Sequence, residues 1–172
     1  MRLRGYDYSQ PGAYCVTVCT QVKEHLFGRV VEGAMIANDA GRMVDSVWKF
    51  MPREFPCVEL DEYVVMPNHF HALFRIVGAP LVGTRDSAIQ QRAGTRRGDP
   101  APTVGDIVGA FKSITTDEYI RGVHTYGWVP FKRHVWQRGF YDHIVRNDEE
   151  LSIIRDYIQT NPLRWEKDPE NS

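Results

Sequence analysis

Two histidines separated by a single residue are the side chains in this sequence best suited to bind a metal ion. His69 and His71 open an alternating run, His69–Ile76, that predicts a β-strand. Residues i and i+2 of a strand face the same side and lie about 6.6 Å apart along it, so both imidazoles can approach one ion. A His-x-His pair alone is a weak motif, and two surface histidines beside a turn are the alternative.

A third ligand and a nucleophile are available on the last predicted helix. Asn147 and Glu150 form a capping pair that predicts the start of this helix, and Pro162 predicts its end at Asn161. Tyr157 and Asn161 are four residues apart and therefore share a face. The Asn161 amide oxygen is a ligand that Mg²⁺ or Mn²⁺ accepts, and the Tyr157 phenol could attack a phosphate held by that ion.

Tyr141 is a second candidate nucleophile, because Asp142 and His143 follow it directly. An acid and an imidazole beside a phenol could assist an attack, but the same residues also suit a strand packed in a sheet. Tyr157 could in turn be a half-buried helix residue without a chemical role. The residues by themselves leave the choice between the two tyrosines open.

Basic side chains among aromatic ones indicate a surface for single-stranded nucleic acid. Lys132, Arg133 and Arg138 lie in the aromatic segment 128–141, and Lys112 projects from the helix before it. Cations neutralise phosphates, and flat rings stack on unpaired bases. The net charge is −1, so any such contact must come from a local patch. A solvated edge strand is the alternative.

The order of the predicted elements indicates an α+β fold. They are a strand at 14–20, a helix at 40–51 closed by Pro52, strands at 58–66 and 69–76 joined as a hairpin, a helix from Thr103 through Ile114, a strand within 128–141 and a helix from Asn147 through Ile158. Strand-helix-strand twice over is a split βαβ plan: one antiparallel sheet with helices against it, plus an extra C-terminal helix.

The length of 172 residues fits a single domain, 1–172. Within it, 77–102 is expected to be a mobile basic loop, either a disordered insertion or a flap that touches nucleic acid, and 166–172 a frayed acidic tail. The three cysteines are expected to be free thiols of a cytoplasmic protein. No apolar run approaches the roughly 20 residues of a membrane span, and no signal peptide is expected.

Several motifs, taken together, resemble a known family. Val64–His71 resembles the HUH motif (His, hydrophobe, His) of single-tyrosine transposases. Trp136–His143 and Asp156–Pro162 resemble the REP-associated tyrosine transposases, a branch that acts on repetitive extragenic palindromes (REPs). Gly5–Ser9 and Phe111–Ser113 also fit that branch. The match covers nearly the whole chain apart from the basic loop and the acidic tail.

The resemblance implies a ferredoxin-like HUH nuclease fold and an endonuclease and strand transferase for single-stranded DNA. It implies a divalent ion, Mg²⁺ or Mn²⁺, on His69, His71 and Asn161, and it places the nucleophile at Tyr157 rather than Tyr141. Hairpin-forming repeats would be cut and rejoined through a 5′-phosphotyrosine intermediate, as in DNA transposition and recombination. We expect a monomer or homodimer.

Two functions of other classes remain open on the sequence alone. A DNA-hairpin-binding module that has lost cleavage would share the fold and the basic surface but form no covalent adduct. A small metal-dependent hydrolase would use the histidine pair to activate water and would survive the loss of Tyr157.

Overall fold

A four-stranded antiparallel sheet lies at the centre of the computed structural model, which describes residues 6–78 and 101–171. Its strands, in the spatial order β4-β5-β1-β6, are β4 (Val58–Val65), β5 (His69–Ile76), β1 (Gly12–Cys19) and β6 (Tyr141–Val145). Helix α1 (Asp39–Glu54) connects β1 to β4, and α2 (Val104–Tyr126) comes between β5 and β6. This order confirms the predicted split βαβ, ferredoxin-like arrangement.

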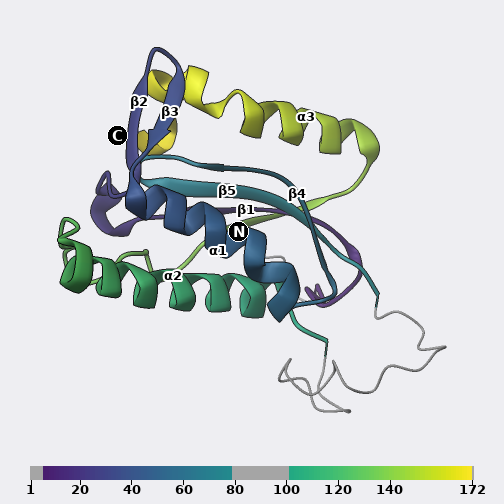
Figure 1. Ribbon diagram of the computed structural model, residues 1–172. Coiled ribbons are helices and arrows are strands. Elements are labelled where there is room, and N and C mark those ends of the chain that lie inside the picture. Colours follow the sequence, from purple (N-terminus) through teal and green to yellow (C-terminus); the bar gives the residue numbers. More distant parts are fainter. Residues whose placement is uncertain (1–5, 79–100, 172) are drawn as a thin grey trace.

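Helices cover both faces of the sheet (Figure 1): α1 and α2 lie on one face, and α3 (Asp148–Gln159) lies on the other. The larger core is on the α1–α2 side. Trp48 of α1 is fully buried there, with its ring 5.1 Å from that of Phe70 on β5 and 5.3 Å from that of Phe111 on α2. The face of β5 that carries Phe70 is therefore part of this core, and the face that carries His69 and His71 is turned toward α3.

Helix α2 begins as the sequence predicts and runs further. Thr103 and Asp106 form a complete capping box, in which each side chain binds the other residue's backbone N–H. The helix continues beyond Ile114 to Tyr126, where Gly127 ends it in the left-handed conformation (φ 68°).

Helix α1 extends two residues past the expected end at Pro52. Proline lacks an N–H, but the residues after it still donate, and Phe55 N–H binds the Met51 carbonyl at 2.8 Å. Proline therefore sits inside the last turn instead of closing the helix.

A two-stranded hairpin of β2 (Gly28–Val31) and β3 (Ala34–Ala37) precedes α1 and was not predicted. Its two-residue turn has positive φ at Glu32 (49°) and Gly33 (76°). A glycine between two short apolar runs was the available signal. The hairpin lies beside the C-terminal segment, residues 161–171 (Figure 1).

Two other expectations are corrected. A strand was expected within 128–141, but residues 128–140 are irregular apart from an isolated bridge between Trp136 and Thr20, and β6 begins at Tyr141. The tail is folded rather than frayed, in the 3₁₀ helices η2 (Asn161–Lys167) and η3 (Pro169–Asn171). Most of the predicted basic loop, 79–100, lies outside the described residues. Among the helices that are described, none is long and apolar enough to cross a membrane.

Candidate metal and nucleophile site

The two histidines of β5 are buried side by side. Their side chains face α3, with exposed fractions of 0% for His69 and 4% for His71, and their ring centroids are 4.5 Å apart. Because β1 pairs with β5, Cys19 lies opposite His69 and Thr17 opposite His71. The alternative of two surface histidines is therefore wrong.

Each imidazole forms a hydrogen bond through its Nδ1 atom. His69 Nδ1 is 2.8 Å from Asn68 Oδ1, and His71 Nδ1 is 2.8 Å from Thr17 Oγ1. The opposite ring nitrogens, both Nε2, are buried and have no hydrogen-bond partner in the described part of the chain. Two unpartnered nitrogen atoms in one buried site are costly unless they bind a ligand.

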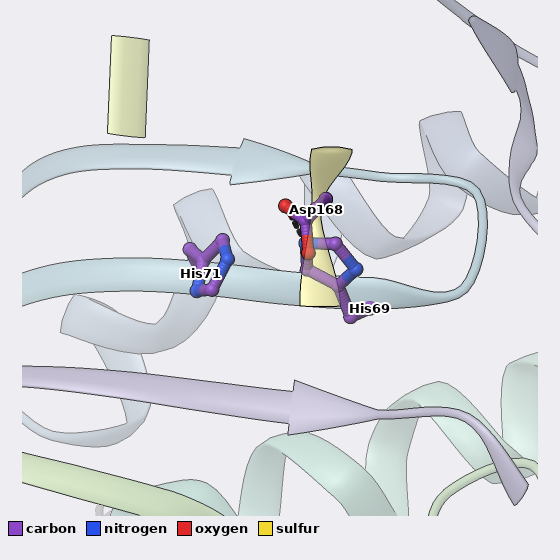
Figure 2. Close-up of side chains that lie close together, drawn as sticks. All are labelled: His69, His71 and Asp168. Carbon is purple, nitrogen blue, oxygen red and sulfur yellow. Dashed lines mark ion pairs between the residues drawn. The ribbon is translucent and has the colours of Figure 1, made fainter. Parts of the chain in front are cut away.

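Asn161 and Asp168 bring oxygen atoms to the same place. Asn161 is fully buried, and its Nδ2 donates to Asp168 Oδ2 at 3.0 Å, which leaves Oδ1 buried and unpartnered among the described residues. Asp168 Oδ2 in turn lies 4.0 Å from His69 Nε2, and a dashed line marks this contact in Figure 2. One ligand atom each from His69, His71 and Asp168 fall within 4.8 Å of one another.

The C-terminal segment is fixed onto the sheet by its own hydrogen bonds. Lys23 Nζ donates to the Pro169 carbonyl at 2.9 Å, Glu170 N–H donates to Asp168 Oδ1 at 2.7 Å, and Asn68 Nδ2 donates to the Glu170 carbonyl at 2.6 Å. These bonds explain why the expected frayed tail is ordered, and they hold the Asp168 carboxylate in place.

Tyr157 is the tyrosine that lies beside this cluster. Its ring centroid is 5.4 Å from that of His71, and it is half-buried between α3 and the sheet. Burial, and then the negative charge of Asp168, raise the pKa of the Tyr157 phenol. Tyr141 is instead 69% exposed on the edge strand β6, where it pairs with Thr17.

Burial keeps both imidazoles neutral. It lowers the pKa of His71 to about 3, with a smaller contribution from the neighbouring His69. It also lowers the pKa of His69, although the charges of Asp168 and Glu170 oppose that shift. Neutral imidazoles retain the lone pair that a metal ion requires.

The donor atoms present fit a divalent cation. Two imidazole nitrogens, one amide oxygen and one carboxylate oxygen form a mixed set that suits ions accepting both nitrogen and oxygen ligands. Three of these four atoms, His69 Nε2, His71 Nε2 and Asn161 Oδ1, are otherwise unpartnered within the described ranges. Asp168 was missed by sequence reasoning, because nothing in the spacing of the tail relates it to the histidines.

The four basic residues expected to contact DNA are not equivalent. Lys112 Nζ donates to the carbonyls of residues 137–139 at 2.5, 3.1 and 3.2 Å, so its three donors are used inside the protein. Lys132 Nζ lies 3.8 Å from Glu24 Oε1, while Arg133 and Arg138 are exposed.

The aromatic rings around these cations are mostly core residues. Trp136 is 4% exposed and donates from Nε1 to Thr115 Oγ1 at 2.8 Å, and the Phe131 ring lies 5.5 Å from that of Tyr119. Tyr141 is the exposed aromatic residue of the group. The expected alternation of cations and stacking rings therefore reduces to exposed arginines and one accessible ring.

Arg138 lies at the end of the sheet that carries His69. Gln137 N–H binds the Cys19 carbonyl at 2.9 Å, and Cys19 pairs with His69 on the other side of β1. Arg138 directly follows Gln137, so its backbone is separated from β5 by a single strand.

Comparison with known proteins agrees with this architecture. No family model matches the chain. An uncharacterized protein of Haemophilus influenzae (strain Rd) is 36% identical over 170 residues, which cover 98% of this chain and 89% of that protein. The chain belongs to the family of that protein.

The solved structures show the fold. A REP-associated tyrosine transposase bound to a REP hairpin superposes with a TM-score of 0.53 at 20% identity, over 95% of this chain and 74% of that one. A candidate transposase of Deinococcus radiodurans R1 aligns over 92% of this chain and 95% of its own at 15% identity and a TM-score of 0.46, too distant to add to the argument. The fold of this family member is therefore that of the HUH transposases, as the motifs predicted.

Proposed function

We propose that this protein is a metal-dependent endonuclease and strand transferase for single-stranded DNA, of the REP-associated tyrosine transposase type, acting at hairpin-forming repeats. One observation carries the proposal. Tyr157 lies beside His71 in a buried cluster where His69 Nε2, His71 Nε2 and Asn161 Oδ1 have no partner among the described residues. A nucleophile next to a set of metal-ligating atoms suits phosphoryl transfer.

In this proposal four residues bind the metal ion and Tyr157 is the nucleophile. His69, His71, Asn161 and Asp168 would hold a divalent ion, Mg²⁺ or Mn²⁺, and that ion supplies positive charge to a scissile phosphodiester. Tyr157 Oη attacks the phosphorus and loses its proton. The new Tyr–O–P bond forms as the P–O3′ bond breaks, and the departing oxygen takes up a proton as a free 3′-hydroxyl.

Rejoining is the same step in reverse. A 3′-hydroxyl attacks the 5′-phosphotyrosine, an O3′–P bond replaces the Tyr–O–P bond, and Tyr157 regains its proton. The number of phosphoester bonds never changes, so strand transfer needs no high-energy cofactor. Because burial raises the pKa of Tyr157, the phenol is protonated at neutral pH and must be oriented for attack rather than ionised in advance.

A labelled adduct on a denaturing gel tests this proposal. The substrate is a hairpin with single-stranded flanks, taken from repeats in the genome of origin and incubated with Mn²⁺ or Mg²⁺. We expect label on wild type and on Tyr141→Phe, and none on Tyr157→Phe, since phenylalanine keeps the packing and removes only the attacking oxygen. If wild type binds such hairpins but never carries label, the protein is a binding module without cleavage.

A further inference from the structure

The imidazole of His69 is bound by the side chain of the residue that precedes it. Asn68 is fully buried between the turn after β4 and the C-terminal segment. Its Oδ1 lies 2.8 Å from His69 Nδ1, and its Nδ2 lies 2.6 Å from the Glu170 carbonyl oxygen and 3.5 Å from that of Lys23.

The surroundings of Asn68 determine the orientation of its amide. Backbone carbonyl oxygens accept hydrogen bonds and cannot donate them, so the group facing Glu170 and Lys23 must be the NH₂ group. The amide oxygen is then the atom that faces His69. An amide oxygen also only accepts, so the partner that donates is His69 Nδ1–H.

A proton on Nδ1 determines what the other ring nitrogen can do. A neutral imidazole carries a single proton, and with Nδ1 protonated the lone pair lies on Nε2. His69 Nε2 is buried, has no partner among the described residues, and points toward the Asp168 carboxylate at 4.0 Å. In the opposite tautomer, Nδ1 and Asn68 Oδ1 would be two acceptors facing each other at 2.8 Å.

We propose that Asn68 is a positioning residue, which fixes the proton of His69 on Nδ1 so that Nε2 faces the candidate metal centre as a free ligand. The inference rests on the proposed function for the role of the metal ion, but the tautomer itself is a property of the metal-free protein. The Glu170 backbone is therefore part of the site, because its carbonyl orients the Asn68 amide. Outer hydrogen bonds of this kind typically change metal affinity about 10- to 100-fold.

Replacement of Asn68 separates its two hydrogen bonds. Asn68→Ala removes both, which leaves either tautomer of His69 available. Asn68→Asp keeps an oxygen that accepts from Nδ1–H but removes the donor to Glu170. Asn171→Ala is the matched control, because the Asn171 amide donates to the Trp165 carbonyl at 2.9 Å in the same segment and makes no hydrogen bond to His69 within the described residues.

The test uses two measurements on the full chain. Long-range ¹H–¹⁵N correlation spectra of ¹⁵N-histidine-labelled, metal-free protein at neutral pH report the tautomer of His69. Electron paramagnetic resonance of added Mn²⁺ reports its affinity. We expect the Nδ1–H form in wild type, Asn68→Asp and Asn171→Ala. In Asn68→Ala we expect a mixture of tautomers and an Mn²⁺ affinity that is lower by at least about tenfold.

An Nε2–H tautomer in wild type would overturn the proposal. So would an Asn68→Ala variant with unchanged tautomer and unchanged Mn²⁺ affinity. If Asn68→Ala does not fold, Asn68→Asp decides, since a proton that moves to Nε2 in that variant contradicts the role of the oxygen. Wild type that binds no Mn²⁺ would count against the proposed function, while the tautomer in the metal-free protein would still decide the role of Asn68.

Discussion

The Asp168 carboxylate lies close to two other residues of the candidate site, Asn161 and His69. It accepts a hydrogen bond from Asn161 Nδ2 at 3.0 Å, which leaves Asn161 Oδ1 without a partner among the described residues, and it lies 4.0 Å from His69 Nε2. One side chain can thus supply a ligand atom and orient another. A substitution that removes the negative charge of Asp168 but keeps an oxygen therefore tests the contribution of the charge.

Asp168→Asn should weaken divalent metal binding without unfolding the protein. The variant keeps one oxygen in place of the two that accept from Asn161 Nδ2 and from the Glu170 N–H, and it removes the negative charge, so we expect Mn²⁺ affinity to fall at least about tenfold. Isothermal titration calorimetry measures the change. Glu166→Gln, an exposed acid of the same segment, is the control. Equal affinities in wild type and Asp168→Asn would exclude the carboxylate from the site.

The residues of the site differ in how far the sequence reveals them. His69 and His71 follow from strand periodicity, because i and i+2 share a face whatever the rest of the fold. Asp168 cannot be found in this way. Its place depends on the path of the chain after Pro162 and on hydrogen bonds to Lys23 and Asn68, which are distant in sequence.

At the scale of elements, α2 contains two glycines in different environments. A Cβ added to Gly122 would meet the ring of Trp128 at 2.1 Å, whereas one added to Gly109 meets nothing within 4 Å. The first glycine allows Trp128 to pack on the helix after the turn at Gly127, and the second only leaves the helix backbone more flexible when unfolded.

Alanine at these two positions should therefore have opposite effects. Gly122→Ala should lower the free energy of unfolding by about 1–3 kcal/mol, because the indole must move. Gly109→Ala should raise it by about 0.5–1 kcal/mol through helix propensity. Urea unfolding followed by circular dichroism measures both. A stabilising Gly122→Ala would show that Trp128 does not pack there.

A bidentate ion pair connects α3 to β4. Arg155 donates from Nε to Asp61 Oδ1 at 2.8 Å and from Nη2 to Asp61 Oδ2 at 2.6 Å. The hydrogen bond from Arg155 holds the pKa of Asp61 below its ordinary value. Because the folded-state pKa is the lower one, the pair stabilises the protein at neutral pH. That contribution is lost as the pH falls through the folded-state pKa.

Asp61→Asn should accordingly destabilise the protein at neutral pH and have progressively less effect in acid. Urea unfolding at pH about 7 and pH about 3, on either side of the unfolded aspartate pKa, should show the difference from wild type shrinking. Asp156→Asn is the control, since Asp156 is exposed and lies 3.8 Å from Arg164. A difference that does not change with pH would argue against the ion pair.

The elements were largely predictable from local signals. Helix α2 begins after Thr103 as expected, and Asn147 caps α3 through the Glu150 N–H as expected, because capping depends only on neighbouring residues. At α3 the second half of the expected box is different, since the Glu150 carboxylate accepts from Arg146 N–H. The prediction of a strand before Tyr141 was wrong, because Phe131 and Trp136 pack against the core instead of extending the sheet. Burial by tertiary contacts has no strand periodicity.

At the scale of the whole molecule, the net charge of −1 leaves DNA affinity to local cations. Arg133 and Arg138 are exposed, and Arg138 is near the end of the sheet that carries His69. The donors of Lys112, in contrast, bind backbone carbonyls within the protein. The expected nucleic-acid surface is therefore narrower than the sequence suggested. As we propose it, this surface would lie along the segment that leads into β6.

Binding to a hairpin with single-stranded flanks should weaken as salt rises, through counterion release. Arg133→Ala and Arg138→Ala should each reduce the slope of log affinity against log salt by about 1. Arg53→Ala, at the end of α1 that leads to the opposite end of the sheet, should leave the slope unchanged. Fluorescence anisotropy provides the measurement. Equal affinity for a blunt duplex of the same length would contradict a single-strand enzyme.

The central claim is that Tyr157 becomes covalently bound to DNA, and peptide mapping of the adduct tests it most directly. Trypsin places the two candidate tyrosines in separate peptides, Asp156–Arg164 and Gly139–Arg146. After reaction with a hairpin substrate and Mn²⁺, nuclease trimming and mass spectrometry, the peptide with Tyr157 should carry the added mass of a 5′-linked nucleotide. The same mass on the peptide with Tyr141, or on neither peptide, would contradict the assignment.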